Sequence, residues 1–380
     1  MVIFPNHAVL REGRNLVLEI AEADLVRCLR IRLGPIAIAS FREDGNNTST
    51  PGRLNCEEVS LFKLNAFSHE GSVLRKLINY VWVVLVTPFP LLRCRFAYIF
   101  CPGHCGAIAS LWAIILRRPY GLYVRGTWLS PDGRTSWLWK QVFRNAAFII
   151  ATGEAFRRRL GAFNDFVENE VPLTKIVSPG SRNVIARRLP VIRKLLFAGR
   201  LTESKGILDL IMAVAIGCRE FSLDIALLIA GGGTPDEEEQ AKRIAQECEV
   251  SERISFLGHV ADVEVMRQYY HLADAFIFPS YYREGFPRVL YEAMMCALPI
   301  VTTEMPGTEG FLVDSKNCLI CKPRDPHDIV QCITRLSRNP KLALAIGTQA
   351  CNDVLEVFNG FKHPSHADQL ISLTELTHRL

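Results

Sequence analysis

The sequence offers little that would carry the chain across a membrane. Its most apolar stretch, Leu77–Leu92, is 16 residues long and has Pro88 and Pro90 near its end, whereas a membrane-spanning helix needs about 20 residues. The first residues, Met1–His7, lack the basic segment and the long apolar core of a secretory signal. We therefore expect a cytoplasmic protein in which residues 77–92 form a buried or interfacial helix.

Signals for metal binding and nucleic-acid binding are also scarce. No Asp-x-Asp motif is present, and Cys318 and Cys321 form a single C-x2-C pair without the second pair of a zinc site. The 12 cysteines are scattered and lie mostly in apolar runs, which favours reduced, buried thiols. Neither a zinc finger nor a basic helix with base-reading residues stands out. We expect no metal, no cofactor and no nucleic-acid partner.

Acidic residues are scarce in the first half of the chain. Residues 1–190 hold 25 Lys and Arg against 14 Asp and Glu, a balance of +11, and the remaining residues have a balance of −6. Such an asymmetry suggests that the first half meets an anionic partner. Because nucleic-acid motifs are absent, we favour the anionic inner face of the cytoplasmic membrane as a peripheral partner. A solvated basic face is the alternative.

Strand-like and helix-like runs alternate along the chain, and its 380 residues predict two domains with parallel sheets flanked by helices. The strand-like runs of the first half are Val2–Phe4, Ile36–Ser40, Ala97–Phe100, Gly121–Val124, Phe148–Ala151 and Lys175–Val177. Its helix-like runs are Asn15–Leu29, Gly106–Leu116, Ser136–Arg144 and Glu154–Leu160. Residues 43–72 are polar and predict a long surface loop or a variable insertion, and the alternation resumes over residues 193–339.

The most informative segment contains two carboxylates eight positions apart, Glu284 and Glu292. The apolar run just before them, Ala275–Pro279, predicts a short buried strand, so Glu284 falls in a strand-to-helix loop and Glu292 in the following helix. In an open α/β sheet such a loop lies where ligands bind. Its amides and the helix N-terminus suit a phosphate. A carboxylate is useful there when the ligand also offers hydroxyls, as a sugar nucleotide does.

Two cations follow another predicted strand. Arg200 and Lys205 stand at the spacing G-R-L-x-x-x-K-G, in which Gly199 lets the backbone turn close to a ligand. The pair predicts an anion site, although an isolated pair is read equally well as solvated surface cations. Residues 231–233 are three glycines after a strand, and we interpret them as a tight turn lining the pocket. They do not indicate a dinucleotide site, because the order G-x-G-x-x-G is absent.

These segments together resemble the retaining glycosyltransferases of the GT-B fold, the family-four glycosyltransferases or glycosyl transferases group 1. Glu284 and Glu292 match the E-x7-E signature of that family. The other matching segments, in the order of the family, are Leu196–Gly206, Leu227–Gly233, Phe256–Gly258, Leu272–Asp274, Pro279–Ser280, Leu298–Thr303 and Pro306–Glu309. The resemblance is close over residues 192–340 and mostly architectural over residues 1–190.

The resemblance implies two Rossmann-like domains whose parallel sheets face a cleft. The expected boundaries are 1–185 for an acceptor-binding domain, 186–362 for a nucleotide-sugar-binding domain, and 363–380 for a C-terminal helix that crosses back to the first domain. The implied reaction moves a hexosyl group, with retention, from a nucleotide-diphosphate sugar to a saccharide or lipid-linked oligosaccharide in surface polysaccharide biosynthesis. Two alternatives stay open: an inactive scaffold partner, and a sugar-nucleotide epimerase or hydrolase on the same fold.

The resemblance also implies a role for each site residue. Glu284 would bind the hydroxyls of the donor sugar and Glu292 those of the ribose, while Arg200 and Lys205 would stabilise the departing diphosphate in place of a metal. The remaining donor-binding positions are Gly231, Gly285, Phe286 and Gly13, the last as a partial match to a glycine pair after the first strand.

The first half departs from the family at two positions. Arg125 stands at the end of a predicted strand where many relatives carry His. Because a guanidinium stays protonated, it would bind a donor phosphate or an acidic acceptor and would not act as a base. His104 follows another predicted strand, and is interpreted either as facing the cleft or as an ordinary loop histidine.

Overall fold

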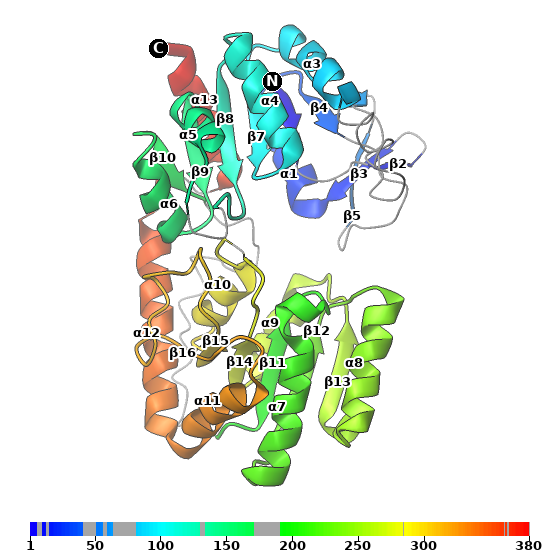
Figure 1. Cartoon of the computed structure of the whole chain (residues 1–380), viewed down its shortest axis with the longest axis vertical. Coiled ribbons are helices and arrows are strands. Elements are labelled where there is room, and N and C mark those ends of the chain that lie inside the picture. The colour runs from blue at the N-terminus through cyan, green and yellow to red at the C-terminus, as the bar shows by residue number, and fades with distance from the viewer. Residues whose placement is uncertain are drawn as a thin grey trace. The chain divides into compact units, whose positions relative to one another are not determined.

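The chain folds into two compact units in the computed structural model. Unit 1 comprises Met1–Leu173 and Lys362–Leu380, and unit 2 comprises Thr174–Phe361; each has its own sheet (Figure 1). The structure describes residues 1–5, 10–12, 15–40, 51–55, 59–63, 81–129, 134–170, 191–283, 285–360, 362 and 365–379. The predicted strand Lys175–Val177 and the predicted linker after it lie outside the described residues.

The described strands of unit 1 form a seven-stranded parallel sheet in the order β10-β9-β8-β7-β1-β4-β6. Their bounds are β1 Val2–Phe4, β4 Ala37–Ser40, β6 Ser60–Lys63, β7 Ala97–Cys101, β8 Tyr120–Val124, β9 Phe148–Ala151 and β10 Val167–Asn169. Strands β1, β4, β7, β8 and β9 are buried at every position. Unbroken apolar runs of this kind form because helices cover both faces of a parallel sheet.

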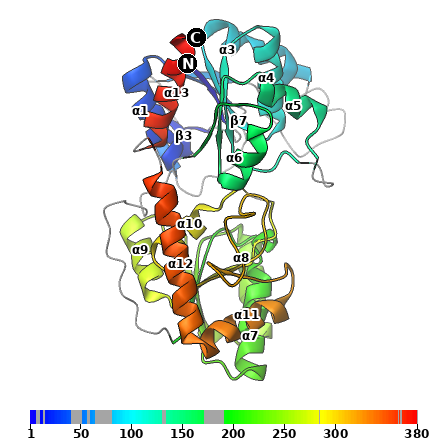
Figure 2. The same cartoon turned by 90° about the vertical axis from the view of Figure 1, so that its left-hand side faces the viewer.

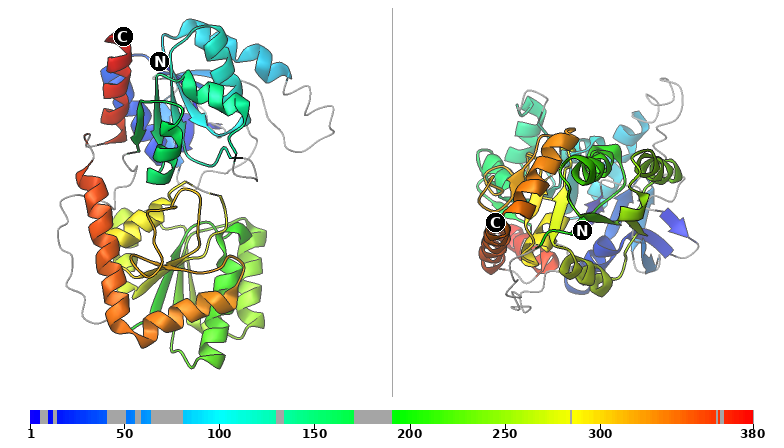
Figure 3. Two further views of the ribbon diagram at one scale, coloured as in Figure 1. Left: turned by 60° about the vertical axis from the view of Figure 1, so that its left-hand side comes forward. Right: turned by 90° about the horizontal axis from the view of Figure 1, so that it is seen from below.

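Those helices make two layers, which Figure 2 shows on either side of the sheet. One layer is α1 (Ile20–Leu33) with α13 (His366–Arg379); the other has α3 (Pro88–Arg93), α4 (His104–Ile115), α5 (Trp137–Arg144) and α6 (Glu154–Gly161). The C-terminal helix α13 thus belongs to unit 1 (Figure 3). Arg32 Nη1 lies 2.7 Å from Asp368 Oδ1, and the Tyr98 hydroxyl lies 3.1 Å from His366 Nε2.

The prediction of a helix over Asn15–Leu29 is wrong in its first part. Residues Asn15–Glu19 form strand β3, which pairs antiparallel with β2 (Leu10–Glu12) and β5 (Pro51–Asn55), before α1 begins at Ile20. Leu16 stands opposite Leu54 in this sheet and both are buried, so a pairing distant in sequence overrides the local pattern. The predicted loop over residues 43–72 accordingly contains β5 and β6.

The described strands of unit 2 form a six-stranded parallel sheet in the order β13-β12-β11-β14-β15-β16. Their bounds are β11 Lys194–Ala198, β12 Ala226–Ala230, β13 Ile254–Gly258, β14 Ala275–Phe278, β15 Ile300–Thr302 and β16 Leu319–Ile320. The chain adds β12 and β13 on one side of β11 and then returns to place β14 on the other. The strand order therefore reverses between β11 and β14, and open α/β sheets bind ligands at such a point.

Helices cover both faces of this second sheet as well (Figure 2). One face carries α7 (Ile207–Glu220), α8 (Pro235–Glu247) and α11 (Pro326–Arg338); the other carries α9 (Val263–Leu272), α10 (Arg288–Met295) and α12 (Pro340–Asn359). No helix within the described part of either unit is long and apolar enough to cross a membrane.

Candidate functional site

The loops that follow β11 and β14 are joined to one another. The backbone N–H groups of Tyr281 and Tyr282 donate to the Ser204 carbonyl oxygen at 3.0 and 3.1 Å. Gly206 has a φ of +73°, and a Cβ there would lie 2.2 Å from the Pro279 carbonyl oxygen. Only glycine fits such an approach. The Lys-Gly pair of the sequence motif therefore allows the two loops to meet at the reversal of strand order.

Lys205 is placed by this junction. It ends a short 3-10 helix, η1 (Glu203–Lys205), and only 9% of the residue is exposed. Its Nζ lies 5.4 Å from the ring centroid of Phe278, the last residue of β14, and 5.5 Å from that of Tyr282. Two aromatic faces at this distance stabilise an ammonium group. The other predicted cation, Arg200, follows β11 on the same loop but is exposed.

The glycine turn after β12 packs against the loop after β11. A Cβ on Gly231 would lie 1.8 Å from the Gly199 carbonyl oxygen, so a side chain is excluded. Gly199 N–H donates to the Ala230 carbonyl at 2.9 Å, and Leu201 N–H donates to the Gly232 carbonyl at 3.1 Å. The loops after three neighbouring strands thus form one connected edge.

Glu292 lies in α10 and is buried, with 9% of the residue exposed. The Tyr270 hydroxyl, from α9, donates to Glu292 Oε2 at 2.8 Å. Burial raises the pKa of Tyr270 well above its usual value, and the neighbouring carboxylate raises it further, so the phenol keeps the proton that it donates. Glu292 is not an exposed helix-start carboxylate; it is an oriented acceptor behind the loop after β14.

The loop between β14 and α10 also packs against Tyr291 and against the loop that follows β15. Gly285 and Phe286 are buried, and the Phe286 ring stacks on Tyr291 with centroids 3.9 Å apart. A Cβ on Gly307, in the loop after β15, would lie 2.1 Å from the Gly285 carbonyl carbon. Glu284, the first carboxylate of the motif, lies outside the described residues.

The predicted residues of unit 1 lie at the ends of two neighbouring strands. Arg125 directly follows β8; its guanidinium lies 5.6 Å from the Tyr123 ring centroid, and its N–H donates to the Cys101 carbonyl at 2.9 Å. His104 begins α4 after β7 and is exposed. Both therefore stand at the carboxyl edge of this sheet. Gly13 lies outside the described residues.

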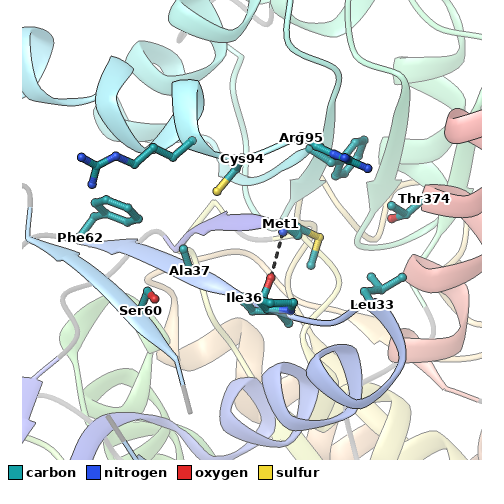
Figure 4. Close-up of a pocket in the computed structure, with 12 residues that line it drawn as sticks. Met1, Leu33, Ile36, Ala37, Ser60, Phe62, Cys94, Arg95 and Thr374 are labelled. Atoms are coloured by element: carbon teal, nitrogen blue, oxygen red, sulfur yellow. Dashed lines mark hydrogen bonds between the residues drawn. The ribbon is translucent and has the colours of Figure 1, made fainter. Parts of the chain in front are cut away.

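A cavity of about 820 Å³ lies at the opposite edge of the sheet of unit 1 (Figure 4). Its lining includes Met1, Ala37 and Ser60, at the starts of strands, together with Arg93 and Arg95. None of the predicted site residues lines it. This cavity is therefore separate from the edge that carries Arg125 and His104.

Sequence reasoning missed Tyr270 and Tyr282. Tyr270 lies on a different helix from Glu292, and no local pattern links the two. Tyr282 lies inside the motif segment, but its contact with Lys205 on the neighbouring loop could not be predicted from the sequence.

The described residues contain no group of His, Cys, Asp and Glu side chains that would hold a metal. Cys318 and Cys321 flank β16 and are buried, and burial raises the pKa of Cys318 to about 12.

Residues 192–353, less than half of the chain, match the model of the family described as Glycosyl transferases group 1. Unit 2 contains a glycosyl transferases group 1 domain. The predicted family is thereby confirmed for this part of the chain. Its matched range covers the loops after β11, β12, β14 and β15 and all of α10.

Curated relatives of this chain are glycosyltransferases. An uncharacterized glycosyltransferase of Methanocaldococcus jannaschii is 28% identical over 228 residues, which cover 58% of this chain and 57% of the relative. The N,N'-diacetylbacillosaminyl-diphospho-undecaprenol alpha-1,3-N-acetylgalactosaminyltransferase of Campylobacter jejuni is 26% identical and is covered to 58%, as is this chain. The chain spans about half the length of the curated relatives it matches.

The likeness to solved structures extends over both units. Anabaena HepE in complex with UDP is 18% identical and superimposes with a TM-score of 0.64, covering 99% of each chain. At this identity the likeness concerns the fold alone. It confirms the predicted GT-B fold, with two α/β units built on parallel sheets.

Proposed function

We propose that this chain is a retaining glycosyltransferase. It would move a hexosyl group from a nucleotide-diphosphate sugar to a saccharide or lipid-linked oligosaccharide, in surface polysaccharide biosynthesis. Unit 2 would bind the donor and unit 1 the acceptor. The observation that carries the proposal is the junction at β11 and β14, where glycine contacts bring Lys205 beside the loop that leads to Glu292.

The donor assignment rests on chemistry that the described residues supply. Buried Lys205 and exposed Arg200 offer positive charge beside a loop with backbone amides, which suits a diphosphate. Glu292, oriented by Tyr270, is an acceptor for the hydroxyls of a ribose. The domain match and the UDP bound by the Anabaena protein support a nucleotide donor.

In the proposed reaction the bond between the anomeric carbon and the diphosphate oxygen breaks, and charge grows on the departing phosphate. Lys205 and Arg200 stabilise that charge, so no metal is needed. The acceptor hydroxyl oxygen bonds to the anomeric carbon on the face that the diphosphate leaves. Its proton passes to the departing phosphate oxygen, which accounts for retention without a protein base. Glu284 holds the donor-sugar hydroxyls through this step.

For the acceptor we propose a role of Arg125 or His104, which share one edge of unit 1. A cation suits an acidic group of the acceptor saccharide, and the Campylobacter relative takes its name from a diphospho-undecaprenol-linked acceptor. The transfer would take place in the cytoplasm, at the inner face of the membrane.

The first test is binding of nucleotides followed by the stereochemistry of transfer. Thermal unfolding is measured with UDP, GDP, ADP, their nucleosides and their hexose conjugates; a ligand at 100 times its Kd stabilises the fold by about 2.7 kcal/mol. One nucleoside diphosphate should stabilise far more than its nucleoside. Transfer should proceed in excess EDTA. NMR of the product should show the same anomeric configuration as in the donor sugar. Inversion, loss of activity restored by magnesium, or turnover of donor without acceptor would each overturn part of the proposal.

A further inference from the structure

One end of unit 1 exposes an unusual number of large apolar side chains. Each of six residues leaves between 48% and 66% of its surface exposed: Val81, Trp82, Leu85, Phe89, Leu92 and Ile115. They come from the helical residues 81–86, from α3 and from the last turn of α4. We call these six residues the apolar surface. Large apolar side chains exposed together on adjoining segments mark an interaction site.

Hydrogen bonds fasten these helices to one another. Trp112 Nε1, on α4, donates to the Val84 carbonyl oxygen at 2.7 Å, and Arg118 Nη2 donates to the Leu92 carbonyl oxygen at 3.3 Å. The first bond joins α4 to the helical residues 81–86, and the second joins the residues just after α4 to α3, so the segments that carry the exposed side chains are connected to one another.

The charged residues nearest to the apolar surface along the sequence are basic. Between Glu70 and Asp132 the sequence has no acidic residue and seven Lys or Arg. Arg93 ends α3, and Arg117 and Arg118 follow Ile115 closely. Arginines beside exposed apolar side chains suit an anionic bilayer, which provides negative headgroups around an apolar interior.

We propose that unit 1 docks on an anionic phospholipid bilayer through the apolar surface and the arginines beside it. Trp82 and Phe89 would lie at the level of the headgroups, the depth that amphipathic aromatic rings prefer. The arginines would pair with lipid phosphates, an attraction that salt screens. This inference rests on the apolar surface and its charge, and not on the proposed transfer reaction.

The position of the surface gives it a definite role. Leu92 and Ile115 lie just before the starts of β7 and β8, whereas His104 and Arg125 follow the ends of these strands. The docked surface and the proposed acceptor edge are thus at opposite ends of the same sheet. Docking would therefore hold the enzyme at the membrane without forming part of the acceptor site.

The test is co-sedimentation of the full chain with vesicles of phosphatidylcholine, alone or mixed with phosphatidylglycerol, at low and high salt. We expect binding to the mixed vesicles that weakens as salt rises. The triple variant Trp82→Ser, Leu85→Ser, Phe89→Ser should bind about tenfold or more weakly. The control is Trp137→Ser, because Trp137 is even more exposed than Trp82 but lies on α5; it should bind as the parent chain does.

A second pair of variants tests the charge. Arg117→Glu should weaken binding to the mixed vesicles, whereas Lys242→Glu, an exposed change on unit 2, should not. Unchanged nucleotide binding would show that the variants fold. Equal or negligible binding to both kinds of vesicle would overturn the proposal. So would lipid-free dimerisation that the triple variant abolishes in sedimentation velocity, since the surface would then join two copies of the chain.

Discussion

The two units share one architecture but differ in the loop contacts at the edge of the sheet where ligands bind. In each, the first strand is joined on one side by its successors and on the other by a later strand. In unit 2 the loops at this reversal touch backbone to backbone: a Cβ on Gly206 would lie 2.2 Å from the Pro279 carbonyl oxygen. In unit 1 the loop after β1 lies outside the described residues. Between the loops after β7 and β8, a Cβ on Gly126 would lie 3.6 Å from Pro102, an ordinary contact, although a Cβ on Gly106, at the start of α4, would lie 2.4 Å from the Phe100 carbonyl oxygen.

The difference has a physical meaning. In unit 2 the close glycine contacts fix the positions of the loop amides and of Lys205. Such preorganisation suits a site that binds the same ligand in every reaction. The ligand edge of unit 1 carries the proposed acceptor residues Arg125 and His104 instead. We therefore expect changes in unit 2 to affect donor binding and chemistry, and changes in unit 1 to affect the acceptor.

The largest expected effect is at Glu284 in unit 2. Glu284→Gln should abolish transfer while leaving nucleotide binding and the fold nearly unchanged, because only the donor-sugar contact loses its charge. Product formation and nucleotide binding are measured on the same preparation. Near-normal turnover in the variant would end the assignment of Glu284 as catalytic.

Lys205→Ala should raise the barrier by about 2–4 kcal/mol, the range for removal of one preorganised charge stabiliser. Arg200→Ala should have a smaller effect, because Arg200 is exposed and Lys205 is buried. Both should weaken the binding of a nucleoside diphosphate more than that of its nucleoside, as isothermal titration would show. Equal losses for the two ligands would mean that Lys205 acts through the fold.

Much of the fold could be predicted from the sequence. Unit 2 was predictable because its strands are short apolar runs, and β11, β12 and β14 are followed directly by Gly199, Gly231 and Pro279. Both of these signals are local in the sequence. β3 was not predictable, because its apolar run suits a helix or a strand and only the pairing of Leu16 with Leu54 decides. A pairing between residues that are distant in the sequence cannot be predicted from the local pattern of either segment.

The candidate site divides in the same way. The motif predicted that Glu292 lies in a helix behind a loop, which α10 confirms, since residue spacing sets that placement. Its burial and its bond to Tyr270 were not predictable, because α9 and α10 meet only through tertiary packing. The roles of Glu284 and Gly13 stay predictions from the resemblance.

Tyr270→Phe tests whether the orientation of Glu292 matters. The variant removes one hydrogen bond to a charged group, a contact worth about 1.5–3 kcal/mol, and keeps the ring in place. We expect weaker binding of the nucleotide with a smaller change in kcat. The matched control is Tyr269→Phe on the same helix, which should leave nucleotide binding unchanged. An equal change in both variants would indicate a general effect on α9.

Arg125→Ala in unit 1 should raise the acceptor KM, by about tenfold, and leave the donor KM unchanged, because a charge-assisted contact contributes about 1.4 kcal/mol or more. Initial rates with each substrate varied in turn give the two constants. A change in the donor KM alone would place Arg125 with the donor and contradict the division of labour between the units.

The smallest expected effect concerns an ion pair of unit 1 that lies away from the proposed chemistry. Arg157 bonds Glu154 through two nitrogens, at 2.8 and 2.6 Å, and Asn169 adds a bond at 2.8 Å. These bonds, chiefly the one to Arg157, lower the pKa of Glu154. A carboxyl whose pKa is lower in the folded state than in the unfolded state stabilises the fold at pH values above the unfolded pKa of about 4.3. That stabilisation is lost as the pH falls through the folded pKa.

Glu154→Gln should therefore lower the free energy of unfolding by less than about 1 kcal/mol at neutral pH, because the pair is partly exposed. The difference from the parent chain should shrink as the pH falls below about 4. Urea unfolding across this pH range measures it, with transfer activity at neutral pH as a control that should not change. A difference that persists in acid would show that Glu154 stabilises unit 1 through packing or hydrogen bonding and not through its charge.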